Sequence, residues 1–115
     1  DNAVGFTTTL PAATGSGGVY RFYVKTTVTS GTMLVQALAG DLIVGAVLFE
    51  GDAAADAAQG FTALLASSFI TVNISTTAKG GTAGSFFTLM DVATDRWAVT
   101  GTFHGTGTEE TPFTV

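Results

Sequence analysis

The sequence contains no cysteine and a single histidine, and these absences exclude several kinds of site. Without cysteine there is no disulfide scaffold, no thiolate metal ligand and no cysteine nucleophile. His104 alone falls short of the two or three histidines that a histidine metal site normally needs. We therefore expect no metal ion and no other cofactor, and we interpret His104 as a partly exposed strand residue.

Charged residues are also scarce, at 11% of the chain, and only four are basic. Those four, Arg21, Lys25, Lys79 and Arg96, are scattered along the sequence. Binding to a phosphate backbone or to an anionic membrane surface takes clustered positive charge, so we expect neither nucleic acid nor membrane as a partner. The longest apolar run, at 42–49, is far shorter than the roughly 20 residues of a membrane-spanning helix.

Sequence motifs of catalysis are missing as well. No G-x-S-x-G elbow accompanies the serines and aspartates. The glycine runs at 15–18 and 80–84 lead into strand-like segments, whereas a phosphate loop leads into a helix, so we interpret both runs as hairpin loops. Asp91 and Asp95 flank a polar turn, where aspartate commonly bonds to the local backbone. We therefore expect a protein that is not an enzyme.

Glycine, threonine and short apolar segments are what the chain has in abundance. Its 15 glycines separate segments in which apolar and polar residues alternate, which is the pattern of short strands. The clearest case is residues 10–24, where a proline and a glycine turn lead into a new strand. The outer face of that strand carries Arg21, Tyr23 and Lys25, which are candidates for contact with an acidic patch on another protein.

The strand-like segments recur about every ten residues, and a chain of 115 residues suits one domain. We expect strands at 4–10, 19–29, 33–38, 42–49, 69–75, 85–92 and 97–103. This spacing predicts an all-β fold, an antiparallel two-sheet β-sandwich of seven or eight short strands with little or no helix, in which jelly-roll connections are one option. The single domain spans 1–115, with flanking arms at 1–6 and 108–115.

Two further stretches are candidates for a protein interface. Residues 42–49 are apolar on both faces, so this strand is either covered on both sides within the domain or meets a neighbouring subunit. For the second alternative the candidate contact residues are Ile43, Val47 and Phe49. In the otherwise polar tail, Pro112 and Phe113 are further candidates, because an aromatic side chain can fill a pocket on a partner.

Three stretches taken together carry a family resemblance. They are L-P-A-A-T-G-S-G-G-V-Y-R-F-Y-V at 10–24, K-G-G-T-A-G-S at 79–85 leading to L-M-D-V at 89–92, and W-A-V-T-G-T-F-H-G-T-G-T at 97–108 with T-P-F at 111–113. This combination resembles a β-sandwich module of virion structural proteins in tailed bacteriophages, of the head decoration (cement) type. The resemblance covers most of the chain, and residues 33–66 match least.

The resemblance implies a protein on the outer surface of the virion capsid that stabilises contacts between major capsid protein subunits. It also implies a homo-oligomer, with a trimer favoured, and it supplies no catalytic residues. A surface poor in charge suits a protein that packs against other copies or a larger assembly. The alternatives are a tail or head-fibre accessory module that binds a host surface, and an extracellular bacterial carbohydrate-binding or adhesion domain.

Overall fold

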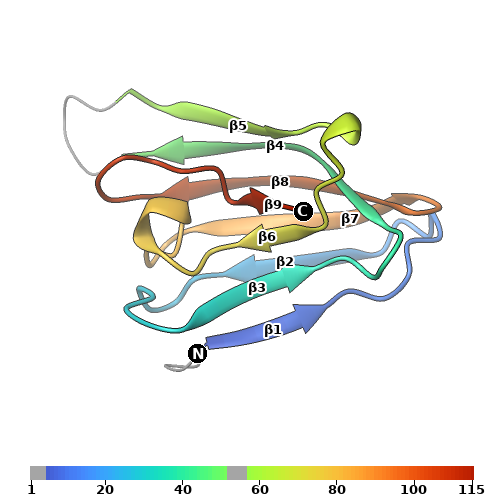
Figure 1. The fold of residues 1–115 in the computed structure, drawn as a ribbon, viewed down its shortest axis with the longest axis horizontal. Coiled ribbons are helices and arrows are strands. Elements are labelled where there is room, and N and C mark those ends of the chain that lie inside the picture. Colours follow the sequence, from blue (N-terminus) through green and yellow to red (C-terminus); the bar gives the residue numbers. More distant parts are fainter. Residues whose placement is uncertain (1–4, 52–56) are drawn as a thin grey trace.

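The computed structural model describes residues 5–51 and 57–115, and about half of this part forms the strands of two packed sheets (Figure 1). The smaller sheet has the order β1 (Gly5–Thr9), β3 (Thr32–Gln36), β6 (Thr71–Asn73), β9 (Phe113–Thr114). The larger sheet has the order β2 (Val19–Tyr23), β7 (Phe86–Ala93), β8 (Arg96–His104), β4 (Leu42–Glu50), β5 (Gln59–Ala63). The helices described are two short 3-10 turns, η1 (Leu65–Ser67) and η2 (Thr77–Lys79), and neither could cross a membrane.

The predicted all-β sandwich of two sheets is confirmed, but both sheets are mixed rather than antiparallel. β1 runs parallel to β3, and β4 runs parallel to β8, whereas the other five described strand pairings are antiparallel. A parallel pair needs a crossover instead of a hairpin. Here the chain leaves β4 through β5, visits the smaller sheet in β6 and returns through β7 before it forms β8 (Figure 1).

Several strands are shorter than the sequence predicts, and one expected arm is part of the sandwich. The expected strand at 19–29 ends at Tyr23, although Val24 still bonds through its N–H to the carbonyl of Ser85 at 2.8 Å. The segment at 108–115 is not an arm at its end, because β9 pairs with β6. Of the other expected arm, residues 1–4 lie outside the described part, and residues 5–6 belong to β1.

A row of phenylalanines crosses the inner face of the larger sheet, with one residue from each strand. In sheet order these are Phe22, Phe87, Phe103, Phe49 and Phe61. Their successive ring centroids lie 4.9, 5.6, 5.8 and 5.6 Å apart, and the last three contacts are edge-to-face. Such pairs contribute about 0.5–1.5 kcal/mol each beyond the burial of their area. We call these five side chains the phenylalanine row.

The backbone of β8 comes close enough to its neighbours to require glycine at two positions. A Cβ at Gly101 would lie 2.6 Å from the Cα of Phe87, the residue opposite it in β7. Gly45 in β4 has a φ of +130°, and a Cβ there would clash with the carbonyl of Val99. The close approach that glycine in the middle of the 42–49 strand suggests is therefore present, and it lets β4 and β8 pair tightly.

The smaller sheet contributes the other half of the core. Val35, Val72 and Phe113 are buried on its inner face, and the Phe113 ring stacks on Phe69 with centroids 5.9 Å apart. Opposite them, Trp97 of β8 is only 1% exposed and lies inward as the alternation predicts. The two inner faces together form one contiguous hydrophobic core.

Replacing Phe103 by alanine tests the importance of the phenylalanine row. Phe103 is fully buried and contacts both Phe87 and Phe49, so we expect a loss of about 3–5 kcal/mol in the free energy of unfolding. Urea unfolding followed by tryptophan fluorescence measures it. The matched control is Thr100→Ala on the exposed face of the same strand, with an expected loss below about 1 kcal/mol. Equal losses in the two variants would show that the row does not stabilise the fold.

Candidate interaction surface

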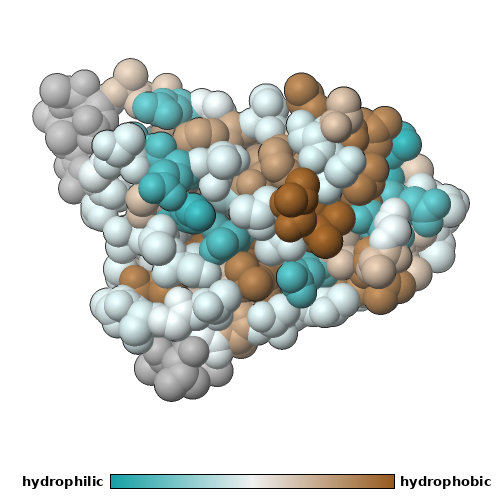
Figure 2. Space-filling view, viewed as in Figure 1, coloured by the Kyte–Doolittle hydropathy of each residue, from teal (hydrophilic) through white to brown (hydrophobic). Residues whose placement is uncertain are grey.

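The two sheets present outer faces of different chemistry. In the smaller sheet, the residues that alternate with the buried ones are mostly polar, namely Thr7, Thr9, Leu34, Gln36 and Asn73. Figure 2 shows this side of the molecule, where hydrophilic and near-neutral residues dominate and hydrophobic ones are scattered. A polar outer face is what a sheet exposed to water normally carries.

The outer face of the larger sheet consists of two rows with large apolar side chains and a row between them without any. Strand partners share a face, so each row follows from the pairing register. The first row is Tyr23, Phe86, Thr102, Leu48. The middle row is Arg21, Thr88, Thr100. The third row is Val19, Met90, Ala98, Val44.

The large apolar side chains of these rows are open to solvent. Tyr23 is 68% exposed, and Val19, Leu48, Phe86 and Met90 are each between 42% and 48% exposed. Arg21 is the only charged residue in the three rows. The sandwich has two layers, and the inner faces pack against each other, so within residues 5–51 and 57–115 no further layer covers the outer face. Large apolar groups gathered on one exposed face are typical of an interaction surface.

The structure places the predicted site residues of the second strand on this face or beside it. Arg21 and Tyr23 belong to the outer face, and Lys25 follows the end of β2 as an exposed residue. The structure therefore presents all three to solvent, as the alternation predicts. Their contact with an acidic patch on another protein stays a prediction.

The prediction that Ile43, Val47 and Phe49 contact a neighbour is wrong, because these side chains lie in the core. Ile43 and Phe49 are 0% exposed, and Val47 is 3% exposed. Both faces of this strand are apolar, so the sequence alone does not decide which of them is inside. The packing of Phe49 against Phe103 and Phe61 decides it. The residues of β4 that point outward are those between the buried ones, such as Leu48.

The predicted contact role of Pro112 and Phe113 is also wrong. Both side chains are fully buried, and Phe113 docks within its own chain as part of β9. The preceding segment is held in place by the backbone N–H of Glu110, which donates to Ala78, and by an ion pair of 3.7 Å between Lys79 and Glu110. The end of the chain therefore completes the smaller sheet.

Sequence analysis missed Phe86, Met90 and Leu48 as surface residues. A usable signal was present in β7, where Phe86, Thr88 and Met90 alternate with the buried Phe87 and Leu89. When large apolar residues occupy both the odd and the even positions of one strand, they point to both faces of the sheet. In a two-layer fold some of them must then be exposed. This signal shows which strand has two apolar faces, but the pairing register is needed to say which face is outside.

The loop at 10–18 is fixed by two buried carboxylates from distant parts of the chain. Asp91 of β7 accepts hydrogen bonds from the backbone N–H groups of Thr14, Gly15 and Ser16, at 3.0, 2.6 and 3.1 Å, and from the Ser16 hydroxyl at 2.7 Å. Asp41 accepts one from the N–H of Ala13 at 2.7 Å. The prediction that Asp91 bonds to its local turn is therefore wrong, since its partners lie more than 70 residues away in the sequence.

These hydrogen bonds change the acidity of Asp91. Burial alone raises the pKa of a carboxyl group, because it disfavours the charged form. Here the hydrogen bonds from Thr14, Ser16 and Gly15 outweigh burial and hold the pKa of Asp91 well below its ordinary value. The carboxylate is therefore more stable in the folded chain than in the unfolded one. Its contribution to stability is complete above the ordinary pKa of about 4 and is lost as the pH falls further.

The variant Asp91→Asn tests this arrangement. We expect a melting temperature several degrees lower at pH 7, because an amide nitrogen then faces backbone N–H donors. We also expect a weaker pH dependence of stability between about pH 4 and pH 2, since the group that titrates there is gone. Thermal unfolding followed by circular dichroism across this pH range measures both effects.

The matched control for Asp91→Asn is Asp95→Asn. Asp95 is exposed and occupies the turn between β7 and β8 with a φ of 61°, a conformation that asparagine tolerates. We expect its melting temperature and its acid sensitivity to stay close to those of the parent chain. An Asp91→Asn chain that unfolds in acid like the parent would show that this carboxylate does not account for the acid sensitivity.

The other polar groups near β8 hold strands together. The Ser85 hydroxyl accepts a hydrogen bond from the backbone N–H of His104 at 2.9 Å, so it binds the strand and not the imidazole. The His104 ring lies 3.5 Å from the Glu50 carboxylate across the β4–β8 pair.

No protein-family model, curated protein or solved structure matches this chain. Its function is therefore inferred from its own residues.

Proposed function

We propose that this chain is a virion structural protein of the tailed-bacteriophage decoration type and that it is not an enzyme. It binds the outer surface of an assembled capsid and stabilises contacts between major capsid protein subunits. The outer face of the larger sheet makes this contact. The observation that carries the proposal is the contrast between this exposed apolar face and the polar face of the smaller sheet.

The size of the outer face fits a specific protein contact. Five strands about 4.8 Å apart, with a mean length of about 24 Å, make a face of roughly 600 Å². A complex would bury about 1,200 Å² over both partners, which is the lower end of the range for specific interfaces. A single contact of this size is weak to moderate. Repetition over a lattice of identical subunits, in a trimer that binds at several points, raises the overall affinity through avidity.

The chemistry of the outer face suits an ordered protein surface as the partner. Threonines in the middle row can form hydrogen bonds at the contact, and the apolar rows on each side supply the hydrophobic area. Charged residues are generally depleted at the centre of interfaces, and here Arg21 is the only one. The resemblance to phage decoration modules, carried by residues 10–24, by 79–85 with 89–92 and by 97–108 with 111–113, supports the choice of a capsid as that surface.

Co-sedimentation with empty shells tests the proposal, using shells assembled from the major capsid protein of the same genome. The test variant is the double substitution Leu48→Lys with Phe86→Lys, which puts two charges into the first row. We expect the parent chain to sediment with shells and the double variant to bind at least about tenfold more weakly, since loss of one interface hot spot costs about 2 kcal/mol or more.

The matched control carries the same two charges elsewhere. Leu38 and Val115 are 42% and 77% exposed and lie just after β3 and β9 of the smaller sheet, away from the three rows. The double substitution Leu38→Lys with Val115→Lys should bind shells like the parent. Two results would contradict the proposal. One is a parent chain that does not sediment with shells, and the other is equal binding to shells by the two double variants. Binding to host cells or glycans in place of shells would favour one of the alternative functions.

A further inference from the structure

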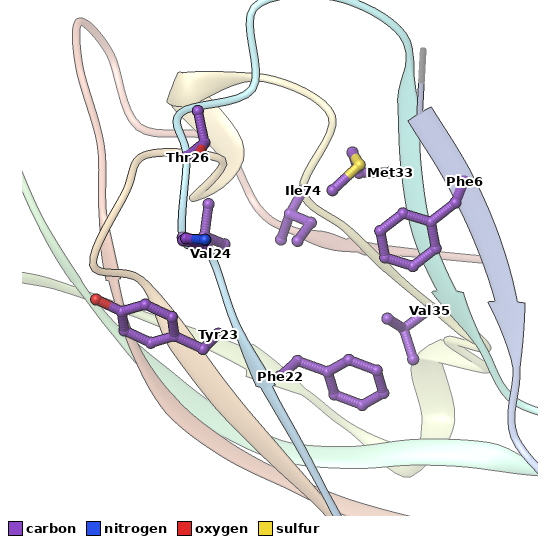
Figure 3. A pocket seen from close by; sticks show the side chains of 9 residues that line it. Phe6, Phe22, Tyr23, Val24, Thr26, Met33, Val35 and Ile74 are labelled. Atoms are coloured by element: carbon purple, nitrogen blue, oxygen red, sulfur yellow. The ribbon is translucent and has the colours of Figure 1, made fainter. Parts of the chain in front are cut away.

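The two sheets separate along one side of the sandwich and leave a cavity there. β1 and β2 are edge strands of their respective sheets, and the cavity lies between them. Its volume is about 140 Å³, and its walls carry six apolar side chains, those of Phe6, Phe22, Val24, Met33, Val35 and Ile74. Figure 3 shows these side chains surrounding an open centre, with β1 and β3 on one side and the chain of β2 on the other.

The cavity has the size and chemistry to hold one apolar side chain. Engineered apolar cavities of about 150 Å³ stay dry and bind benzene. A leucine or phenylalanine side chain of a second polypeptide would therefore fill the space between Phe6 and Phe22. Its burial would also remove apolar surface of the host cavity from water.

The backbone of β2 offers unused hydrogen-bonding positions beside the cavity. The carbonyl of Gly18 and the N–H of Val24 both bond toward β7 or its N-terminal extension, at 2.9 and 2.8 Å. Because backbone bonds alternate in an antiparallel pair, the N–H and C=O groups of Val19, Arg21 and Tyr23 point away from β7. β2 is the edge of its sheet, so these groups form a template for another strand.

Charge identifies the kind of strand that fits. Arg21 and Lys25 are two of the four basic residues of the chain, and both are exposed. In the part of the chain that the structure describes, the ion pairs involve Lys79 and His104, so Arg21 and Lys25 have no acidic partner of their own. A strand next to β2 would place its outward side chains beside these two cations, where acidic residues would be favoured.

We propose that this open side of the sandwich binds an extended acidic segment of a partner protein, which adds a strand to β2 and inserts an apolar side chain into the cavity. Side chains alternate along a strand, so inward positions next to Phe22 and Val24 are apolar and outward positions next to Arg21 and Lys25 are acidic. Opposite residues 21–25 the partner segment therefore has the pattern D-L-T-L-D. Because this pattern is the same in both directions, it fits β2 in either a parallel or an antiparallel pairing. Arg21 and Tyr23 also belong to the outer face of the larger sheet, but the cavity and the free backbone edge of β2 are not part of the shell-binding contact, and the site does not depend on that contact.

The test uses a synthetic peptide with this pattern, acetyl-TDLTLDT-amide, titrated into the full chain labelled with ¹⁵N and ¹³C and followed by NMR of its amide and methyl groups. We expect saturable shifts with a dissociation constant of about 1 mM or tighter. The shifts should centre on the amides of Val19, Arg21 and Tyr23 and on the methyl groups of Val35 and Ile74. Two control peptides, acetyl-TKLTLKT-amide and acetyl-TDTTTDT-amide, should each bind at least about tenfold more weakly.

Two variants at one position separate the backbone contact from the charge. Arg21→Thr removes the charge and keeps the N–H group, whereas Arg21→Pro removes both. The N–H of residue 21 points away from β7, and proline is tolerated at such edge positions, so both variants should keep the parent circular dichroism spectrum. We expect weaker binding by Arg21→Thr and a further loss, of at least about tenfold, by Arg21→Pro.

Three results would overturn the proposal. One is the absence of shifts with millimolar peptide. Another is equal binding of the lysine peptide, and the third is shifts that centre on Phe86, Met90 and Leu48. The last result would assign the peptide to the outer face of the larger sheet and not to the edge of β2.

Discussion

The row of five phenylalanines on the inner face of the larger sheet is the contact on which the rest of the structure depends. Each strand of that sheet contributes one ring, and the rings touch from one edge of the sheet to the other. Side chains alternate along a strand, so placing Phe87 and Phe49 inward forces Phe86 and Leu48 outward. The same packing that builds the core therefore creates the exposed apolar face.

The exposed face has no explanation in the stability of a single chain. A two-layer sandwich buries one face of each sheet, and the smaller sheet meets this constraint with polar outward residues such as Thr7 and Gln36. The larger sheet does not, since Tyr23, Phe86 and Leu48 face solvent in one row. Under the proposed function, a capsid surface that covers these side chains accounts for the difference. The buried carboxylates of Asp91 and Asp41 fix the 10–18 loop, which leads directly into the strand that carries Tyr23.

Local features of the fold could be predicted from the sequence, whereas features set by distant contacts could not. Alternation and glycine turns were sufficient to predict the strand around Trp97 and the sandwich as a whole. The parallel pairing of β4 with β8 depends on a path through both sheets, and no local pattern encodes it. The same is true of Asp91, whose partners are far away in the chain. The inward direction of Ile43 could not be predicted either, because its strand is apolar on both faces and only packing decides between them.

Hydroxyl-radical footprinting of the shell-bound protein tests most directly whether the outer face of the larger sheet is the functional contact. The method labels exposed aromatic, methionine and leucine side chains in the free and bound states. Tyr23, Phe86 and Met90 should be labelled in the free chain and protected on shells, while Leu38, beside the smaller sheet, stays labelled in both states. Unchanged labelling of Tyr23, Phe86 and Met90 on shells would contradict the account.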